Sequence, residues 1–350
     1  MSFPFVQPYF GLGNSLQTAQ AGGAGGIGGW VELARTTLGS AGDDITVGSL
    51  ADKRYYMVLV DGINTGGIDP AFRLNADTGT NYANRRSENG GADGTNTSLN
   101  RMALYSALNT PYFQVGYLAN FATKEKLFQG HLVGRNSAGA GNAPKRGEFV
   151  GKHAQTTNPI SSVTQRNNGT GDHSIGAEVV VLGWDPADTH TSNFWEELAS
   201  VDLSGGANAN LSTGTFTAKK YLWVQVFTEA SSAVLHNITF NNDTGSNYSR
   251  RNSQNGGAEQ TDSSASQIQM WVANTGTWFW NMFIVNNASN EKLAVIHNSE
   301  LSAAGAGTAP NRIDGVAKWA NTSAQITEID FTTTTNTFGT NSIIKVFGSD

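Results

Sequence analysis

The chain of 350 residues contains no cysteine, which excludes disulfide bonds, thiolate metal sites and cysteine nucleophiles. Charged residues make up only 14% of it, against about 25% in an average soluble domain. The net charge is -6 and no run of arginine or lysine is present, so we expect no nucleic-acid partner. No apolar stretch approaches the roughly 20 residues of a membrane helix, and the N-terminus lacks the charged-then-apolar order of a signal peptide. We therefore expect no membrane partner and no signal-directed export.

What the chain has in abundance is glycine, with 41 residues, together with Asn, Ser and Thr. This composition is typical of all-β proteins whose strands are joined by many turns. Strand-length apolar runs such as residues 55–60 and 221–227 indicate central strands that are buried on both faces. Helical periodicity is scarce, and its best stretch, residues 98–108, aligns with the strand-like residues 267–272. We expect about eight to ten strands in each of two units, the number typical of a jelly roll or related β-sandwich.

The two units are copies of one sequence. Residues 75–95 read NADTGTNYANRRSENGGADGT and residues 241–261 read NNDTGSNYSRRNSQNGGAEQT, which are identical at more than half of their positions. The triplet Glu-Lys-Leu at residues 125–127 likewise recurs at residues 291–293. Two copies are too few for a solenoid, so each copy is expected to fold as a domain.

These matches place the domain boundaries. Residues 30–185 and 195–350 form two repeats of equal length, joined by the polar linker 186–194 and preceded by the segment 1–29. We predict two tandem homologous jelly-roll-like β-sandwich domains with an extended N-terminal arm.

The repeated triplet Asp-Thr-Gly matches the active-site triplet of pepsin-like aspartic proteases, which carry one copy in each of two related halves. Two aspartates, here Asp77 and Asp243, would then share one proton and act as general base and acid. In that family apolar residues precede the aspartate, whereas here Asn75-Ala76 and Asn241-Asn242 precede it. This difference argues against a protease.

A local structural role explains the longer repeated motif. The aspartate can close an Asx-turn, while the glycine supplies a left-handed conformation and the arginine pairs with the aspartate. The residues expected in this turn motif are Asp77, Gly79, Asn81, Tyr82 and Arg85, and their copies Asp243, Gly245, Asn247, Tyr248 and Arg251. A calcium site is an alternative, but the alternation and closing glutamate of an EF-hand are missing.

Two further groups of residues have a structural and a functional interpretation. His131 and His297 recur at matching positions, and without cysteine or a carboxylate at ligand spacing we expect them to be satisfied core histidines. Trp271, Trp278 and Trp280 could form a sugar-stacking platform, although aromatic residues that alternate in a strand more often belong to the core. We predict no cofactor and no metal.

The N-terminal segment is a candidate assembly element. Its aromatic residues Phe3, Phe5, Tyr9 and Phe10 lie beside two prolines, and residues 19–29 are rich in glycine. Such a segment becomes ordered only when something holds it. We expect residues 1–29 to lie against a neighbouring subunit, with packing on their own domain as the alternative.

The motif also carries a family resemblance. The strings Leu74-Asn75-Ala76-Asp77-Thr78-Gly79-Thr80-Asn81-Tyr82 and Phe240-Asn241-Asn242-Asp243-Thr244-Gly245-Ser246-Asn247-Tyr248 resemble a segment of structural proteins of tailed bacteriophages, marine ones particularly. The resemblance covers both repeats and implies a virion component without catalytic residues. It implies synthesis in the host cytoplasm, location on the virion, and other copies of the chain and other virion proteins as partners.

Three functions follow from these observations. The first is a non-enzymatic structural protein on the head, as a decoration or cement protein, or on the tail. The second is a receptor-recognition module of a tail fibre or spike, with a host surface glycan as its partner. The third and most distant is an aspartic protease.

Overall fold

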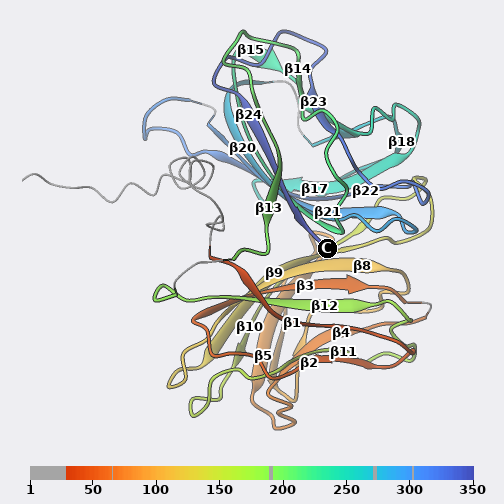
Figure 1. The fold of residues 1–350 in the computed structure, drawn as a ribbon, viewed down its shortest axis with the longest axis vertical. Coiled ribbons are helices and arrows are strands. Elements are labelled where there is room, and N and C mark those ends of the chain that lie inside the picture. Colours follow the sequence, from red (N-terminus) through yellow and green to blue (C-terminus); the bar gives the residue numbers. More distant parts are fainter. Residues whose placement is uncertain (1–28, 65, 189–191, 271–273, 302) are drawn as a thin grey trace, which may run out of the picture.

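The computed structural model describes residues 29–64, 66–188, 192–270, 274–301 and 303–350, and its regular elements there are all β-strands (Figure 1). The first domain holds β1 (Val31–Thr37), β2 (Asp44–Val47), β3 (Tyr55–Gly62), β4 (Pro70–Leu74), β5 (Tyr82–Glu88), β6 (Gly94–Leu99), β7 (Met102–Ala103), β8 (Tyr112–Ala119), β9 (Lys126–Gly134), β10 (Lys145–His153), β11 (Val163–Asn167) and β12 (Glu178–Trp184). The second domain holds β13 (Glu196–Asp202), β14 (Asn210–Ser212), β15 (Tyr221–Val234), β16 (Asn237–Phe240), β17 (Tyr248–Gln254), β18 (Gln260–Ala265), β19 (Ile268–Gln269), β20 (Asn274–Val285), β21 (Lys292–Leu301), β22 (Asn311–Trp319), β23 (Ile329–Thr332) and β24 (Ile343–Ser349).

Each domain pairs a large antiparallel sheet with a small one. The first domain has the strand orders β1-β12-β3-β8-β9-β10-β5-β6 and β2-β11-β4-β7. The second has β13-β24-β15-β20-β21-β22-β17-β18 and β14-β23-β16-β19, so counterpart strands occupy the same places in both domains. The all-β, β-sandwich fold expected from the sequence is confirmed.

The strand count and one local assignment differ from expectation. Each domain has twelve strands among the described residues, against the eight to ten expected. Part of the difference comes from β7 and β19, which are only two residues long and carry no apolar run that marks a strand. The stretch with the most helix-like spacing, residues 98–108, contains the end of β6 and all of β7. Its buried side chains, Met102, Leu104, Tyr105 and Leu108, lie in the core without forming a helix.

The core of each domain lies between its two sheets, where alternate strand residues meet. In the first domain Val58 and Val60 of β3 belong to the same buried cluster as Phe72 of β4. In the second, Trp280 of β20 packs edge-on against Phe331 of β23, with ring centroids 5.8 Å apart. Trp278 and Trp280 are therefore core residues and do not form a sugar platform, and Trp271 lies outside the described residues.

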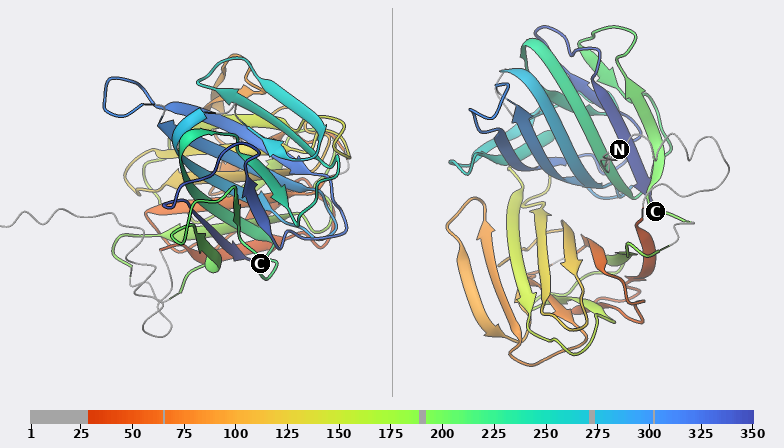
Figure 2. Two further views of the ribbon diagram at one scale, coloured as in Figure 1. Left: turned by 90° about the horizontal axis from the view of Figure 1, so that it is seen from above. Right: turned by 90° about the vertical axis from the view of Figure 1, so that its left-hand side faces the viewer.

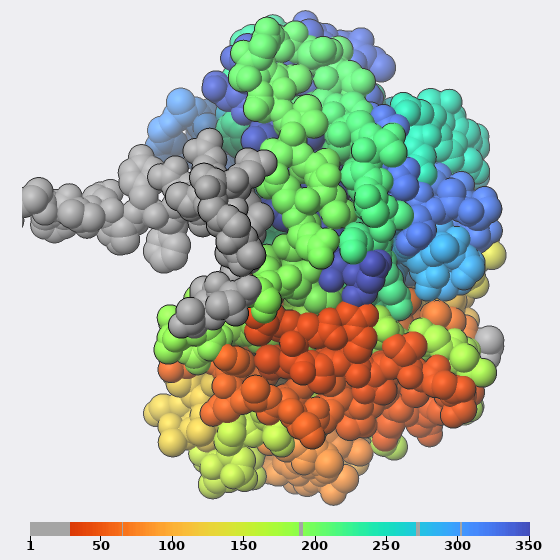
Figure 3. Space-filling model, in the orientation of Figure 1, coloured from red at the N-terminus to blue at the C-terminus, as the bar shows by residue number. Residues whose placement is uncertain are grey.

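The large sheets of the two domains lie against one another (Figures 1 and 2), and a third apolar cluster joins their outer faces. We call it the interdomain cluster, and its buried members are Met57, Leu59, Phe113, Val115, Val133, Val180, Leu182, Phe194, Trp195, Tyr221, Phe283, Val285, Leu293, Val295, Val316 and Phe347. It explains why β3 is buried on both faces, as the sequence predicts. The space-filling view shows the two domains in contact along this boundary (Figure 3).

Charged groups also cross the boundary. Lys220 Nζ of the second domain lies 3.2 Å from Asp61 and 3.1 Å from Glu178 of the first. The hydroxyl of Tyr221 donates a hydrogen bond to Glu178 at 2.8 Å, and burial raises the pKa of Asp61. Because these groups are buried with their partners in the other domain, separating the domains would expose an apolar cluster and break paired charges.

Candidate functional site

The repeated motif builds a corner that leads into β5 in the first domain and into β17 in the second. Asp77 accepts hydrogen bonds from Gly79 N at 2.7 Å and from Asn81 Nδ2 at 2.8 Å. The hydroxyl of Tyr82 then holds the backbone of Leu74 at 3.0 Å. Asp243, Gly245, Asn247 and Tyr248 repeat this arrangement with closely similar distances. The motif therefore closes an Asx-turn in each repeat.

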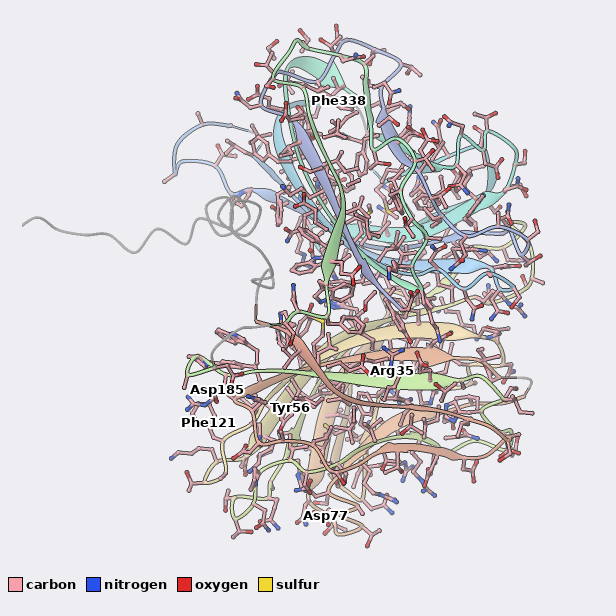
Figure 4. The ribbon with its side chains drawn as sticks, in the orientation of Figure 1. Arg35, Tyr56, Asp77, Phe121, Asp185 and Phe338 are labelled. Atoms are coloured by element: carbon pink, nitrogen blue, oxygen red, sulfur yellow. The ribbon has the colours of Figure 1, made fainter. Side chains whose placement is uncertain are left out.

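Each aspartate has one further partner, and that partner differs between the domains. His153 Nε2 lies 2.7 Å from Asp77, whereas Trp319 Nε1 donates to Asp243 at 2.7 Å. Partial burial opposes ionisation of Asp77, but the hydrogen bonds from His153 and Asn81 outweigh it and lower the pKa of Asp77. These partners all belong to the aspartate's own repeat, and Asp77 lies at the end of the first domain remote from the second (Figure 4). The shared-proton geometry of an aspartic protease is not formed.

Two details of the predicted turn are wrong. The left-handed backbone at the first corner is adopted by Asn75 at φ 53° and Ala76 at φ 52°, and not by Gly79. Arg85 pairs with Asp93 at 3.2 Å and not with Asp77. Glycine adopts a positive φ at least cost, which is why the sequence predicts it at Gly79, but asparagine adopts it readily as well.

The second arginine of the motif connects the domains. Arg251 Nε donates to the carbonyl oxygen of Pro144 at 2.8 Å, and Arg251 Nη1 lies 3.6 Å from Glu259. Glu259 also pairs with Arg146 of the first domain. The expected pairing of Arg251 with Asp243 is therefore replaced by contacts at the domain boundary.

A large concave surface lies on the outer face of the first domain's large sheet. It is a groove of about 890 Å³. We call its apolar lining the open groove, formed by Trp30, Tyr55, Tyr117, Leu127, Val150 and Trp184. Leu127 and Val150 are 58% and 50% exposed, which is unusual for large aliphatic side chains that lie next to one another.

Four aromatic rings form one wall of the open groove. Tyr55 stacks on Trp184 with ring centroids 5.3 Å apart. Trp30 lies 6.4 Å from Tyr117 and 6.5 Å from Trp184. Trp184, Tyr55 and Tyr117 come from β12, β3 and β8, which are successive neighbours in the sheet, and Trp30 immediately precedes β1, which pairs with β12.

The matching surface of the second domain is covered. Leu293 and Val316 occupy the same sheet positions as Leu127 and Val150, as the strand registers show. Both are buried in the interdomain cluster. The counterparts of Trp30, Tyr55 and Tyr117 are Trp195, Tyr221 and Phe283, which belong to the same cluster. The first domain covers this surface with side chains that include Phe113, Val115 and Val133.

The reverse contact is absent between the described parts of the two domains. In the second domain the positions that match Val115 and Val133 are Asn281 and Ser299, and neither of these is buried. Phe279, the counterpart of Phe113, is 43% exposed. Each domain therefore contacts the other through only one half of the outer face of its large sheet. The first domain uses the half that contains Phe113, and the second uses the half that contains Leu293. The open groove lies on the half of the first domain that the second domain does not cover.

A smaller hollow of about 390 Å³ lies where the two domains diverge. His131 and His297 line it, with ring centroids 4.2 Å apart across the boundary. Burial, and secondarily the neighbouring His297, lower the pKa of His131 to about 3. His297 Nδ1 lies 3.2 Å from Asp314. The sequence places both histidines inside their own domains, but the structure places them against one another.

No group of three or more His, Asp or Glu side chains in the described segments has an arrangement that could hold a metal ion. Within the same segments, no helix meets the length and apolarity needed to cross a membrane.

The comparisons with known proteins leave the family open. No family model and no curated protein matches the chain. Among solved structures, the chain is similar to domains LG4-5 of the mouse laminin alpha1 chain, with 10% identity, a TM-score of 0.20, and coverage of 91% of this chain and 90% of that one. It is also similar to Ail, the attachment invasion locus protein of Yersinia pestis, with 5% identity, a TM-score of 0.12, and coverage of 80% and 98%. At these TM-scores neither likeness carries weight for the fold or the function.

Sequence reasoning missed the open groove, and it proposed other residues as functional. The proposed arm residues Phe3, Phe5, Tyr9 and Phe10 lie outside the described residues. A signal for the groove does exist in the sequence. Val150 and Leu127 keep the apolar character of Val316 and Leu293. Two of the covering positions, Val115 and Val133, are replaced by Asn281 and Ser299 in the second repeat.

Proposed function

We propose that the chain is a non-enzymatic structural protein of a tailed-phage virion, carried on the head or the tail. The observation that supports this best is the packing of two complete sandwiches into one block through the interdomain cluster. Domains of one chain usually meet through smaller, more polar surfaces that allow relative motion. A large apolar boundary reinforced by buried ion pairs resists such motion, which suits a component that must keep its shape under load.

The use of the repeated motif supports the same proposal. Its aspartates, asparagines and tyrosines are satisfied by local hydrogen bonds at two corners, and its arginines make ion pairs. An enzyme would need some of these groups to face a substrate with a proton donor or acceptor in reach. The resemblance of the motif to virion structural proteins supports the particle as the proposed location.

Location on the particle is tested by immunogold microscopy with antibodies against the purified chain. We expect gold at one fixed position on purified phage particles, and co-sedimentation of the chain with those particles at a constant ratio. Particles that lack the chain, with all of it in the soluble fraction of infected cells, would overturn the proposal. Pepstatin-sensitive peptide cleavage that is abolished by Asp77→Asn would assign a protease instead.

A further inference from the structure

We propose that the open groove is the docking site for the aromatic head of this chain, residues 1–12. The head carries Phe3, Phe5, Tyr9 and Phe10. This proposal goes beyond the virion assignment and does not depend on it, because it concerns a contact that the purified chain forms by itself or with another copy.

The molecule already contains one example of such a contact. The surface that matches the open groove in the second domain is covered by polypeptide, and the covering side chains include one phenylalanine, Phe113, and two valines, Val115 and Val133. The open groove has kept most of the apolar residues of that surface, although Gln129 stands where the second domain has Val295, and it lacks the cover. An aromatic peptide therefore supplies the kind of side chain that this surface accepts elsewhere in the same chain.

The chemistry of the groove favours a peptide over a sugar. Leu127 and Val150 lie in the groove with most or half of their surface exposed, and aliphatic side chains offer no partner to sugar hydroxyls. Sugar sites combine aromatic faces with several converging polar groups. Polar side chains that include Asn96, Gln129 and Lys152 also line the groove, so the test below includes a glycan. Burying two aliphatic side chains and four rings under phenylalanines is favourable at roughly 25 cal/mol per Å² of apolar surface.

The path of the chain places the head within reach. Gly29, the first described residue, lies so close to Trp184 that an added Cβ would be 1.9 Å from its ring, and Trp30 lines the groove itself. The described chain thus begins at the edge of the open groove. The connecting residues 13–28 are rich in glycine, and a glycine-rich link of this length spans roughly 20 Å. A tethered segment acts at an effective concentration in the millimolar range.

A second copy stacked through the repeat boundary is a poorer occupant. In such a stack, the second domain of one copy would enter the open groove of the next copy. It would do so with the half of its outer face that matches the covering residues of the first domain. That half presents Asn281, Ser299 and Gln225 where the covering half presents Val115, Val133 and Leu59. These polar replacements remove most of the apolar complement that the groove would need and leave Phe279, the counterpart of Phe113.

Cysteine cross-linking tests the docking directly, because the full-length chain has no native cysteine. Phe5→Cys is combined with Val150→Cys in the groove and, as a matched control, with Thr46→Cys. Thr46 is exposed on β2 of the small sheet, on the opposite side of the sandwich. Under mild oxidation we expect the first pair to form a disulfide at least tenfold faster than the control pair. A monomeric product shows docking within one copy and a dimeric product shows exchange between copies, and both support the proposal.

Three results would overturn it. The first is equal cross-linking rates for the two pairs. The second is a concentration-dependent dimer that persists when Phe3, Phe5, Tyr9 and Phe10 are all replaced by serine, which would assign the groove to a second copy. The third is retention on immobilised polysaccharide that Val150→Asp abolishes and the four serine replacements leave unchanged, which would assign the groove to a glycan. If the chain is absent from the virion, the virion proposal fails, but the cross-linking results keep their meaning. The two proposals can therefore be tested independently.

Discussion

At the scale of single residues, the two copies of the motif show how one sequence pattern is completed by different neighbours. Both aspartates accept a hydrogen bond from the glycine two residues later. The remaining partner is a histidine in one domain and a tryptophan in the other. An indole N–H can only donate, whereas a neutral imidazole nitrogen can donate or accept.

This difference predicts unequal effects of the same substitution. Asp243→Asn turns an acceptor toward the Trp319 N–H into a donor, and we expect it to lower the free energy of unfolding by about 1–3 kcal/mol. Asp77→Asn should cost less than about 1 kcal/mol, because His153 can change tautomer and accept. Urea unfolding of the two variants measures both costs. Equal losses of unfolding free energy would show that the difference between the histidine and the tryptophan partner does not affect stability.

The left-handed corner gives a stabilising prediction. Ala76 has φ 52° where the second repeat places Asn242 at φ 54°. Left-handed backbone costs an ordinary L-residue roughly 1–2 kcal/mol, and asparagine tolerates it better. Ala76→Asn should therefore raise the free energy of unfolding, by up to about 1 kcal/mol. Thermal unfolding of this variant beside Asn242→Ala, which should have the opposite sign, checks the argument.

At the scale of strands, the sequence predicted the features that a local residue pattern determines, such as the central strands. It did not predict the features that depend on which surface a strand packs against. Apolar runs such as residues 55–60 revealed central strands, and the repeat revealed two copies of one fold. The pattern of β3 showed that both of its faces are buried, but not that one face lies against another domain. Arg85 and Arg251 were assigned to the aspartate that precedes them in the motif. Arg85 instead pairs with Asp93 in the turn before β6, and Arg251 contacts Pro144 of the other domain.

Lys152 of β10 and Lys318 of β22 occupy matching positions, but only Lys318 lies on a face that the other domain covers. Lys318 is fully buried, and its Nζ donates to the carbonyl oxygens of Arg135 at 3.1 Å and Ser137 at 2.7 Å in the first domain. Lys152 is 48% exposed and pairs with Glu125 at 2.9 Å. Lys318→Met should cost about 3–5 kcal/mol, because it leaves the buried Glu291 without its countercharge. Lys152→Met should cost at most about 1 kcal/mol. Chemical denaturation of the pair measures the difference, and similar costs would mean that Lys318 is solvated.

At the scale of the whole molecule, the histidine pair makes the domain boundary sensitive to acid. The pKa of His131 is lowered from 6.5 to about 3 by burial and by His297. The unfolded chain therefore binds the proton more readily, so stability is full above pH 6.5 and falls as the pH drops toward 3. Proton binding at His131 in the unfolded chain should lower the free energy of unfolding by roughly 2 kcal/mol between pH 8 and pH 5. His131→Gln should flatten this part of the pH profile, which urea midpoints at the two pH values would show. His236 has a similarly lowered pKa. His236→Gln therefore measures how much of the loss of stability at low pH comes from the core of the second domain.

The one-sided boundary makes the final prediction, because it gives two phenylalanines at matching positions opposite environments. Phe113 is buried in the interdomain cluster and Phe279 is 43% exposed. Phe113→Ala should cost about 3–5 kcal/mol, the range for deleting a buried ring, and Phe279→Ala less than about 1 kcal/mol. Because Phe113 lies between the domains, its loss should also separate the unfolding of the two sandwiches. Calorimetry should then show one transition for the unaltered chain and for Phe279→Ala, but two for Phe113→Ala. If both variants instead keep a single transition and lose equal stability, the domains are not joined through this face and the rigid block required for a structural role is absent.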